Sequence, residues 1–230
     1  MAGPPLGLIL LEPDLGTVLV FGPALLAMLF VAGASPRKLA ALVGGGAAAG
    51  VAAFFLVLSR YQRERILVFL DPERDPRGAG FQTLQSRIAV GSGGLSGAGW
   101  GEGTQTQLHV LPEAHTDFIF SVVAEEGGFL AATLLLLLWL ALLLVCLDVA
   151  WRTREPFGRL VAVGIASIFA GQVFVNCGMT VGLMPVTGIT LPLVSYGGSS
   201  LLTSFLALGL VANIALHPVA VLGEDFRADR

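Results

Sequence analysis

A short polar run stands immediately before a long apolar segment, and it is the part of the sequence best suited to chemistry. The run contains Glu113, His115, Thr116 and Asp117. A carboxylate at the edge of an apolar layer is partly desolvated, which favours the neutral acid and raises the pKa toward the range of a useful base. A carboxylate with such a pKa can act as a general base, and a positioned base contributes on the order of 10²–10⁴-fold to a rate.

Two other interpretations of Asp117 stay open at this point. The first is helix capping, because aspartate is favoured at helix N-termini and Asp117 precedes an apolar run. The second is ligation of a divalent cation, Mg²⁺ or Mn²⁺, since carboxylates bind such ions together with phosphate oxygens. The sequence calls for no other cofactor. The spacing of His109, Glu113 and His115 is not a strong zinc pattern, because Pro112 interrupts any helix that would align them.

Other polar residues at the ends of the apolar segments are candidates for binding substrate. Arginine binds phosphate bidentately and stays charged, although acidic residues in the same polar segment could equally pair with its arginines. Glu125 lies inside an apolar run, where an acid is a functional candidate and interhelical hydrogen bonding is the alternative. The candidate substrate-binding residues are Arg60, Arg63, Arg65, Glu113, His115, Thr116, Glu125, Ser195 and Ser199.

Composition identifies the elements that must carry these residues. With 55% hydrophobic residues, 13% charged residues and a mean hydropathy of +0.82, the 230-residue chain is typical of a polytopic membrane protein. Apolar runs of about 20 residues, enough to span the hydrocarbon layer, lie near 15–33, 38–58, 127–149, 160–180 and 199–216. We expect one all-α membrane domain over 1–230, with about five full transmembrane helices, a partial N-terminal one and a large loop at about 59–116.

Charge predicts how this domain lies in the membrane. Short basic connections favour the cytoplasmic side, and they occur at Arg37 and Lys38, over 151–159 and in the tail at Arg227 and Arg230. The C-terminus should therefore be cytoplasmic, and the 59–116 and 181–198 segments extracytoplasmic. The long segment contains six arginines, but its length weakens the rule there. No run rich in lysine and arginine suggests nucleic acid.

Glycines inside the second apolar run carry a further expectation. Small residues let transmembrane helices approach closely, so Gly44, Gly45, Gly46 and Gly50 predict close helix packing. The 91–103 segment contains too much glycine for a stable helix or strand, so we expect tight turns there.

Four motifs in order resemble the SEDS family of membrane proteins. They lie at 12–17, 78–95, 112–120 and 185–200, and 176–188 is more similar to the RodA branch, which acts in elongation, than to the FtsW branch, which acts in division. Because members of the family have more transmembrane helices than this chain, it resembles their C-terminal half. Asp117 stands at the position of the essential aspartate of the family.

The resemblance implies a peptidoglycan glycosyltransferase. Such an enzyme polymerises lipid II into glycan strands at the outer face of the bacterial cytoplasmic membrane, during cell elongation and shape maintenance. The implied partners are lipid II, the undecaprenyl-pyrophosphate-linked glycan, the lipid bilayer and a class B penicillin-binding protein. Two alternatives stay open: a flippase or transporter of lipid-linked precursors, which would use charges deeper in the spans, and an inactive truncated remnant.

Overall fold

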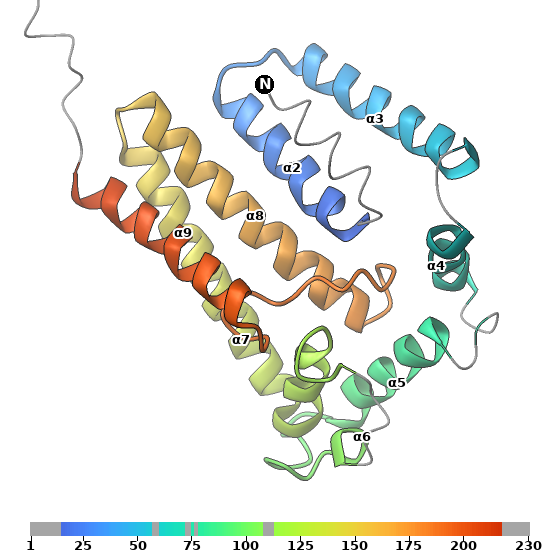
Figure 1. Ribbon diagram of the computed structural model, residues 1–230. Helices are drawn as coiled ribbons and strands as arrows, with labels where there is room; N and C mark the ends of the chain where they lie inside the picture. The colour runs from blue at the N-terminus through green and yellow to red at the C-terminus, as the bar shows by residue number, and fades with distance from the viewer. Residues whose placement is uncertain (1–14, 57–59, 72–74, 76–77, 108–112, 218–230) are drawn as a thin grey trace, which may run out of the picture.

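The protein is a bundle of helices with a cap of short helices at one end (Figure 1). The computed structural model describes residues 15–56, 60–71, 75, 78–107 and 113–217, and all regular structure within them is helical. The long helices are α2 (Leu15–Val31), α3 (Pro36–Leu56), α7 (Ile119–Arg152), α8 (Pro156–Thr180) and α9 (Gly198–Leu216). The short helices are α4 (Arg60–Leu70), α5 (Ala79–Ser92) and α6 (Thr104–Gln107). The predicted all-α membrane fold is confirmed.

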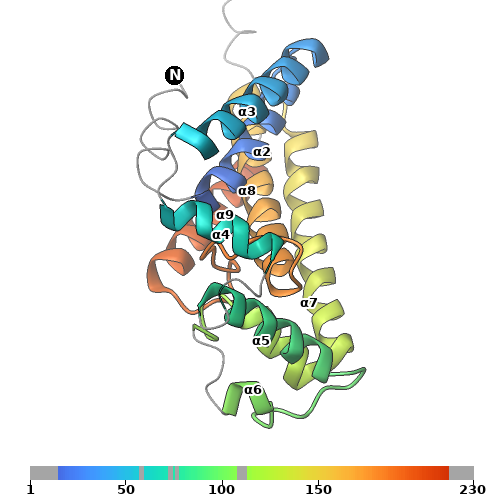
Figure 2. The same cartoon turned by 90° about the vertical axis from the view of Figure 1, so that its right-hand side faces the viewer.

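Four of these helices, α3, α7, α8 and α9, are long and apolar enough to cross a membrane, and α2 is a shorter apolar helix. They correspond to the five runs expected from hydropathy. The expected loop at 59–116 contains helices α4, α5 and α6, and α5 continues to Ser92, the second residue of the glycine-rich segment. α4 lies across one side of the bundle (Figure 2).

Helix α8 is the centre of the bundle and packs against α2, α7 and α9. Glycines on α8 allow the close approach of α2: a Cβ added at Gly164 would lie 3.0 Å from the sulfur of Met28, and one at Gly171 would lie 3.3 Å from Cγ1 of Val20. This is the small-residue packing typical of membrane helices.

The prediction that the glycines of α3 pack closely is wrong for this structure. A Cβ added at any of the four would meet nothing within 4 Å, and α3 has no buried residue. The glycines face open space because α3 lies at the edge of the bundle, where its main packing partner is α2. The positions are Gly44, Gly45, Gly46 and Gly50.

Helix α7 begins before the apolar run predicted at 127–149, and it has a break close to where that run starts. Gly128 has a non-helical, left-handed backbone, with φ of 68°. The break interrupts the helical hydrogen bonds, and the glycine-rich segment supplies replacements: Phe129 N–H donates to the Gly94 carbonyl at 2.9 Å, and Ala98 N–H donates to the Glu125 carbonyl at 2.9 Å. The helical turns at 119–127 are therefore joined by backbone hydrogen bonds to the glycine-rich segment. Hydropathy alone did not predict that they belong to the helix.

The glycines of this segment are needed because backbone meets backbone. A Cβ at Gly93 would collide with the Ala124 carbonyl oxygen, and one at Gly97 would collide with the Glu126 carbonyl oxygen. Gly97 also has a φ of +83°, a conformation that other residues rarely adopt. The predicted tight turns are confirmed, and they secure the N-terminal part of α7.

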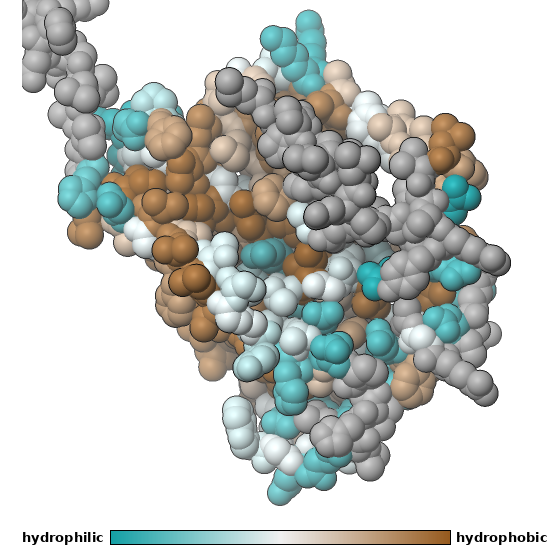
Figure 3. Space-filling model, in the orientation of Figure 1, coloured by the Kyte–Doolittle hydropathy of each residue, from teal (hydrophilic) through white to brown (hydrophobic). Residues whose placement is uncertain are grey.

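On the face shown in Figure 3, hydrophobic residues cover much of the left-hand side, and hydrophilic residues lie at the top and left edge and over much of the lower and right-hand parts. The α2–α3 and α7–α8 connections lie at one end, and α5, α6 and the α8–α9 connection lie at the other. The first end carries the basic residues Arg37, Lys38, Arg152, Arg154 and Arg159. The second end carries the turn at 113–118 that leads into α7.

Candidate active site

Asp117 lies in a turn that precedes α7. The backbone N–H groups of Thr116, Asp117 and Phe118 all point to the carbonyl of Glu113, at 3.2, 3.1 and 3.3 Å. Glu113 itself has a left-handed φ of 55°. The N-cap residue of α7 is Phe118, and no side chain caps this helix. The structure therefore gives the capping alternative for Asp117 no support, because Asp117 precedes the N-cap residue and α7 has no side-chain cap hydrogen bond.

Electrostatics favour a carboxyl that accepts protons readily. Burial raises the pKa of Asp117 above its ordinary value, and the negative charge of Glu113 acts in the same direction. A hydrogen bond with the Thr116 side chain and the positive charge of Arg65 oppose the rise in pKa. Thr116 is fixed in turn, since its hydroxyl lies 3.2 Å from both the carbonyl oxygen and Oε2 of Glu113.

Of the three candidate arginines, Arg65 is the one that the structure ties to this site. Its positive charge acts on the carboxyl of Asp117, and its Nη1 donates to the carbonyl of Val186 at 3.4 Å. Arg65 also lines a cavity of about 290 Å³, whose other walls are Glu64, Val68, Asp75, Gly78, Gln82 and Val186. Arg63 instead donates from Nη2 to the Phe55 carbonyl at 2.9 Å. Arg60 begins α4, but its side chain lies outside the described part of the chain.

The 185–197 connection and α8 hold the backbone of the Asp117 turn. The carbonyl of His115 accepts a hydrogen bond from the Tyr196 N–H at 2.9 Å. The carbonyl of Thr116 accepts from the Ser195 hydroxyl at 2.6 Å, and the carbonyl of Asp117 accepts from Nδ2 of Asn176 at 2.8 Å. Ser195 also accepts from the Leu191 N–H at 2.7 Å. Ser195 is buried, and its hydroxyl contacts are to backbone, so they lend no support to its predicted role in substrate binding.

The same connection brings its backbone close to the carboxylate. Gly188 has a left-handed φ of +74°, and a Cβ added there would lie 3.6 Å from Oδ2 of Asp117. Gly188 and Asn176 are the two residues beside Asp117 that sequence reasoning did not single out, although both belong to the quoted motifs. The signal for Asn176 was available, because an amide near the end of an apolar helix is a functional candidate.

The carbonyl of His115 belongs to the turn, whereas the residue also lines a cavity beside it. The residue is exposed and lines a cavity of about 610 Å³ beside the turn. The other walls of this cavity are Ile119, Leu193, Val194, Ser195, Tyr196, Gly197, Gly198 and Leu201.

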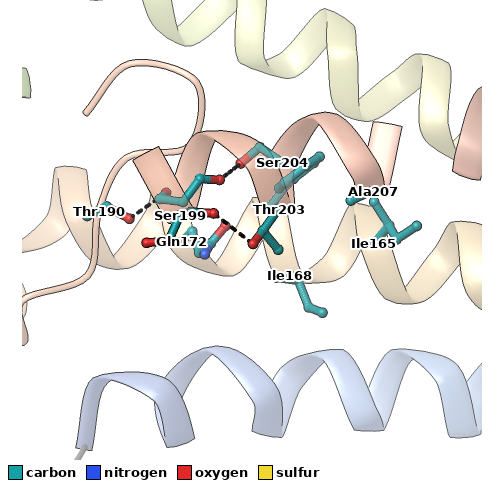
Figure 4. A pocket seen from close by; sticks show the side chains of 10 residues that line it. Ile165, Ile168, Gln172, Thr190, Ser199, Thr203, Ser204 and Ala207 are labelled. Carbon is teal, nitrogen blue, oxygen red and sulfur yellow. Dashed lines mark hydrogen bonds between the residues drawn. The ribbon is translucent and has the colours of Figure 1, made fainter. Parts of the chain in front are cut away.

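Two candidate residues serve other parts of the fold. Glu125 is buried at 1% exposure, and its Oε1 accepts from the Gln105 N–H at 2.8 Å and lies 3.2 Å from the Thr104 hydroxyl. It therefore anchors the start of α6. Ser199 lines a cavity of about 450 Å³ between α8 and α9, where its carbonyl accepts from the Thr203 hydroxyl at 2.8 Å (Figure 4).

The donor set around Asp117 is small. Among the described residues, no three His, Cys, Asp or Glu side chains gather as a metal site. His109, the first member of the zinc-like spacing, lies outside the described residues. The carboxylates of Asp117 and Glu113 are the oxygen donors that a divalent cation would use at this turn.

Comparison with known proteins identifies the family. Residues 2–219 match the profile of the cell cycle protein family of FtsW, RodA and SpoVE. The chain is 46% identical over 210 residues to the peptidoglycan glycosyltransferase MrdB of Escherichia coli K12, which covers 91% of this chain and 57% of MrdB. It is 45% identical over 222 residues to the probable peptidoglycan glycosyltransferase FtsW of Thiomicrospira cyclica, covering 95% of this chain and 56% of that protein.

Solved structures agree. One similar chain belongs to a study of polymerization and crosslinking by a peptidoglycan synthase complex, with a TM-score of 0.75, 39% identity and coverage of 91% of this chain and 58% of that one. Another is RodA of Thermus thermophilus, with a TM-score of 0.62, 34% identity and coverage of 94% and 54%. The chain belongs to the FtsW/RodA/SpoVE family, as the four motifs predicted. It spans little more than half the length of these relatives.

Proposed function

We propose that this chain forms the catalytic part of a peptidoglycan glycosyltransferase that polymerises lipid II into glycan strands during cell elongation and shape maintenance. The observation that carries the proposal is the half-buried carboxyl of Asp117, whose pKa is raised and whose backbone is held on a structured turn. The name of MrdB, peptidoglycan glycosyltransferase, supports this reaction class over the flippase alternative.

The chemistry follows from that carboxyl. Asp117 takes the proton from an acceptor sugar hydroxyl while the hydroxyl oxygen bonds to the anomeric carbon of the lipid-linked donor. The bond between that carbon and the pyrophosphate oxygen breaks, and undecaprenyl pyrophosphate leaves with the electron pair. A guanidinium stabilises phosphate charge through paired hydrogen bonds, so Arg65 is the residue best placed to assist the leaving group.

The proposal leaves room for Mg²⁺ or Mn²⁺ as a cofactor. Asp117 and Glu113 would hold the ion, because hard divalent cations prefer carboxylate oxygens. The bound ion would neutralise negative charge on the donor pyrophosphate.

The proposed enzyme lies in the bacterial cytoplasmic membrane. The basic end of the bundle, together with the C-terminus, would face the cytoplasm, and the Asp117 turn would face outward, where lipid II and the undecaprenyl-pyrophosphate-linked glycan are processed. A class B penicillin-binding protein would be the partner. Similarity to a chain from a peptidoglycan synthase complex supports such an assembly.

The test is polymerisation of lipid II by the purified full-length protein with its partner. We expect Asp117→Asn to lower the rate of strand formation by about 10²-fold or more, the loss typical of a missing base. Asp148→Asn is the matched control, since Asp148 is exposed near the C-terminal end of α7 and should leave the rate unchanged. Strands formed at the normal rate by Asp117→Asn would contradict the proposal.

A further inference from the structure

Asn176 is a fully buried amide beside the candidate base. The residue lies on α8 with 0% exposure. Its Nδ2 donates to the carbonyl of Asp117 at 2.8 Å and to the carbonyl of Ile189 at 2.7 Å. Because both partners are carbonyl oxygens, the amide nitrogen must face them, which settles the orientation of the side chain.

Packing alone does not account for an amide at this position. The other amide atom of Asn176, Oδ1, is buried and has no hydrogen-bond partner among the described residues. A buried unpaired acceptor weakens a fold, so it needs another explanation. The contacts offer an explanation: Nδ2 of Asn176 donates two hydrogen bonds, and these join the turn before α7 to the connection after α8.

The bonds from Asn176 and Ser195 fall on the two peptide groups that flank the α-carbon of Asp117. Ser195 holds the carbonyl of Thr116, which belongs to the peptide group before Asp117, at 2.6 Å. Asn176 holds the carbonyl of Asp117 itself, in the peptide group after it, at 2.8 Å. With both planes fixed, the carboxyl can move only by its own side-chain torsions.

The support for this clamp is rigid. Asn176 projects from the central helix of the bundle, where Val175, Gly178 and Met179 are buried around it. A catalytic group must be held within a fraction of an ångström by residues whose own positions are locked by packing. The placement of Asn176 on α8 meets that requirement better than a residue on a loop.

We propose that Asn176 is a positioning residue for Asp117. Together with Ser195 it fixes the two peptide planes around Asp117, so that the carboxylate is held in one direction for proton transfer. This inference rests on the proposed function, and it assigns Asn176 no contact with substrate. It predicts that losing the clamp slows the chemical step without weakening substrate binding.

The test measures kcat and KM for lipid II polymerisation by the full-length protein with its partner. Asn176→Asp keeps the size of the side chain and removes the amide donor. Because a misplacement of about 1 Å can cost about 10²-fold, we expect kcat to fall about 10- to 100-fold while KM stays within about threefold. Asn213→Asp, the same change at an exposed position on α9, should alter neither constant.

Ser195→Ala provides a second variant that does not depend on burying a carboxyl. It removes the bond to the Thr116 carbonyl, and kcat should fall about 10-fold with KM unchanged. The thermal midpoint of each purified variant shows whether it is folded, and Ser195→Ala decides the outcome if Asn176→Asp does not fold. Normal kcat in the folded variants, or a raised KM with normal kcat, would overturn the positioning role.

Asp117→Asn, measured in parallel, separates the two levels of the proposal. If Asp117→Asn forms strands normally, the proposed function of the site is wrong. If Asp117→Asn is inactive while the folded clamp variants keep a normal kcat, Asp117 remains the catalytic residue and the inference about Asn176 is wrong.

Discussion

One negative and one positive side chain act on the pKa of Asp117, so substituting one or the other should move this pKa in opposite directions. Glu113 raises the pKa and Arg65 lowers it, although burial has the largest effect. A base works only when it is deprotonated, so the rate falls as the pH drops through the pKa of that base. The acid limb of the pH–rate profile therefore reports the environment of Asp117.

We expect Glu113→Gln to shift the acid limb of kcat/KM to lower pH, because it removes a charge that raises the pKa of Asp117. Arg65→Gln should shift the acid limb to higher pH, because it removes a charge that lowers this pKa. The position of the limb is the measurement, since Arg65→Gln should also lower the overall rate. Shifts in the same direction, or no shift in either variant, would argue against Asp117 as the titrating base.

The raised pKa also predicts how stability varies with pH. A pKa above the ordinary 3.8 means that the folded protein favours neutral Asp117, so this contribution to stability is complete below pH 3.8 and is lost as the pH rises through the folded pKa. We expect Asp117→Asn to raise the thermal midpoint at neutral pH, with the advantage disappearing in acid. Thermal unfolding in detergent at the two pH values checks this, and a lower midpoint for Asp117→Asn at neutral pH would contradict it.

The sequence could predict the catalytic candidate Asp117, and it contained a signal for Asn176, but it could not predict which group Asn176 holds. Asp117 was identifiable because the motif at 112–120 places it at the position of the essential aspartate of the family, whereas a carboxylate before an apolar run could by itself be a helix cap. The role of Asn176 depends on a carbonyl 59 residues away in the chain. Glu125 shows the opposite case, since its place in an apolar run suggested the site, whereas its carboxylate holds the start of α6.

At the scale of elements, the glycine-rich segment and the break in α7 form one joint. The segment supplies backbone partners to both sides of Gly128, so the helical turns before the break keep their place relative to the long apolar part of α7. Composition predicted that the segment would turn tightly. It could not predict its partner, because backbone hydrogen bonds between distant segments leave no hydropathy signal.

Gly97→Ala should disturb this joint. The new Cβ would collide with the Glu126 carbonyl oxygen in a backbone conformation that favours glycine, and we expect a loss of about 1–3 kcal/mol of stability. Gly209→Ala on α9 is the control, because its Cβ would meet nothing within 4 Å and alanine favours a helix by up to about 1 kcal/mol. Equal thermal midpoints for the two variants would show that the glycine segment does not secure α7 in this way.

At the scale of the whole molecule, the ends of the bundle differ in charge and in chemistry. The basic connections gather at one end, and the Asp117 turn lies at the other with α5 and α6. Hydropathy and loop charge were sufficient to predict this division, because both are properties of composition. The close packing of α2 on α8 was not predicted, since it depends on which glycines face a neighbouring helix.

Cysteine labelling in intact cells tests the proposed direction of the bundle. Trp100→Cys, at a site 96% exposed near α6, should react with an impermeant maleimide from outside. Arg154→Cys, in the exposed α7–α8 connection, should react only after permeabilisation. The reverse pattern would place the Asp117 turn in the cytoplasm and rule out polymerisation at the outer face.

The most direct test of Asp117 as the catalytic group separates substrate binding from turnover in one variant. Full-length Asp117→Asn would be titrated with lipid II to obtain its Kd, and the same preparation would be assayed for glycan strands. We predict a Kd within about threefold of the unmodified protein together with loss of polymerisation, because a base acts in the transition state rather than in substrate binding. Continued polymerisation, or a loss of activity explained by weaker binding, would contradict a catalytic role for Asp117.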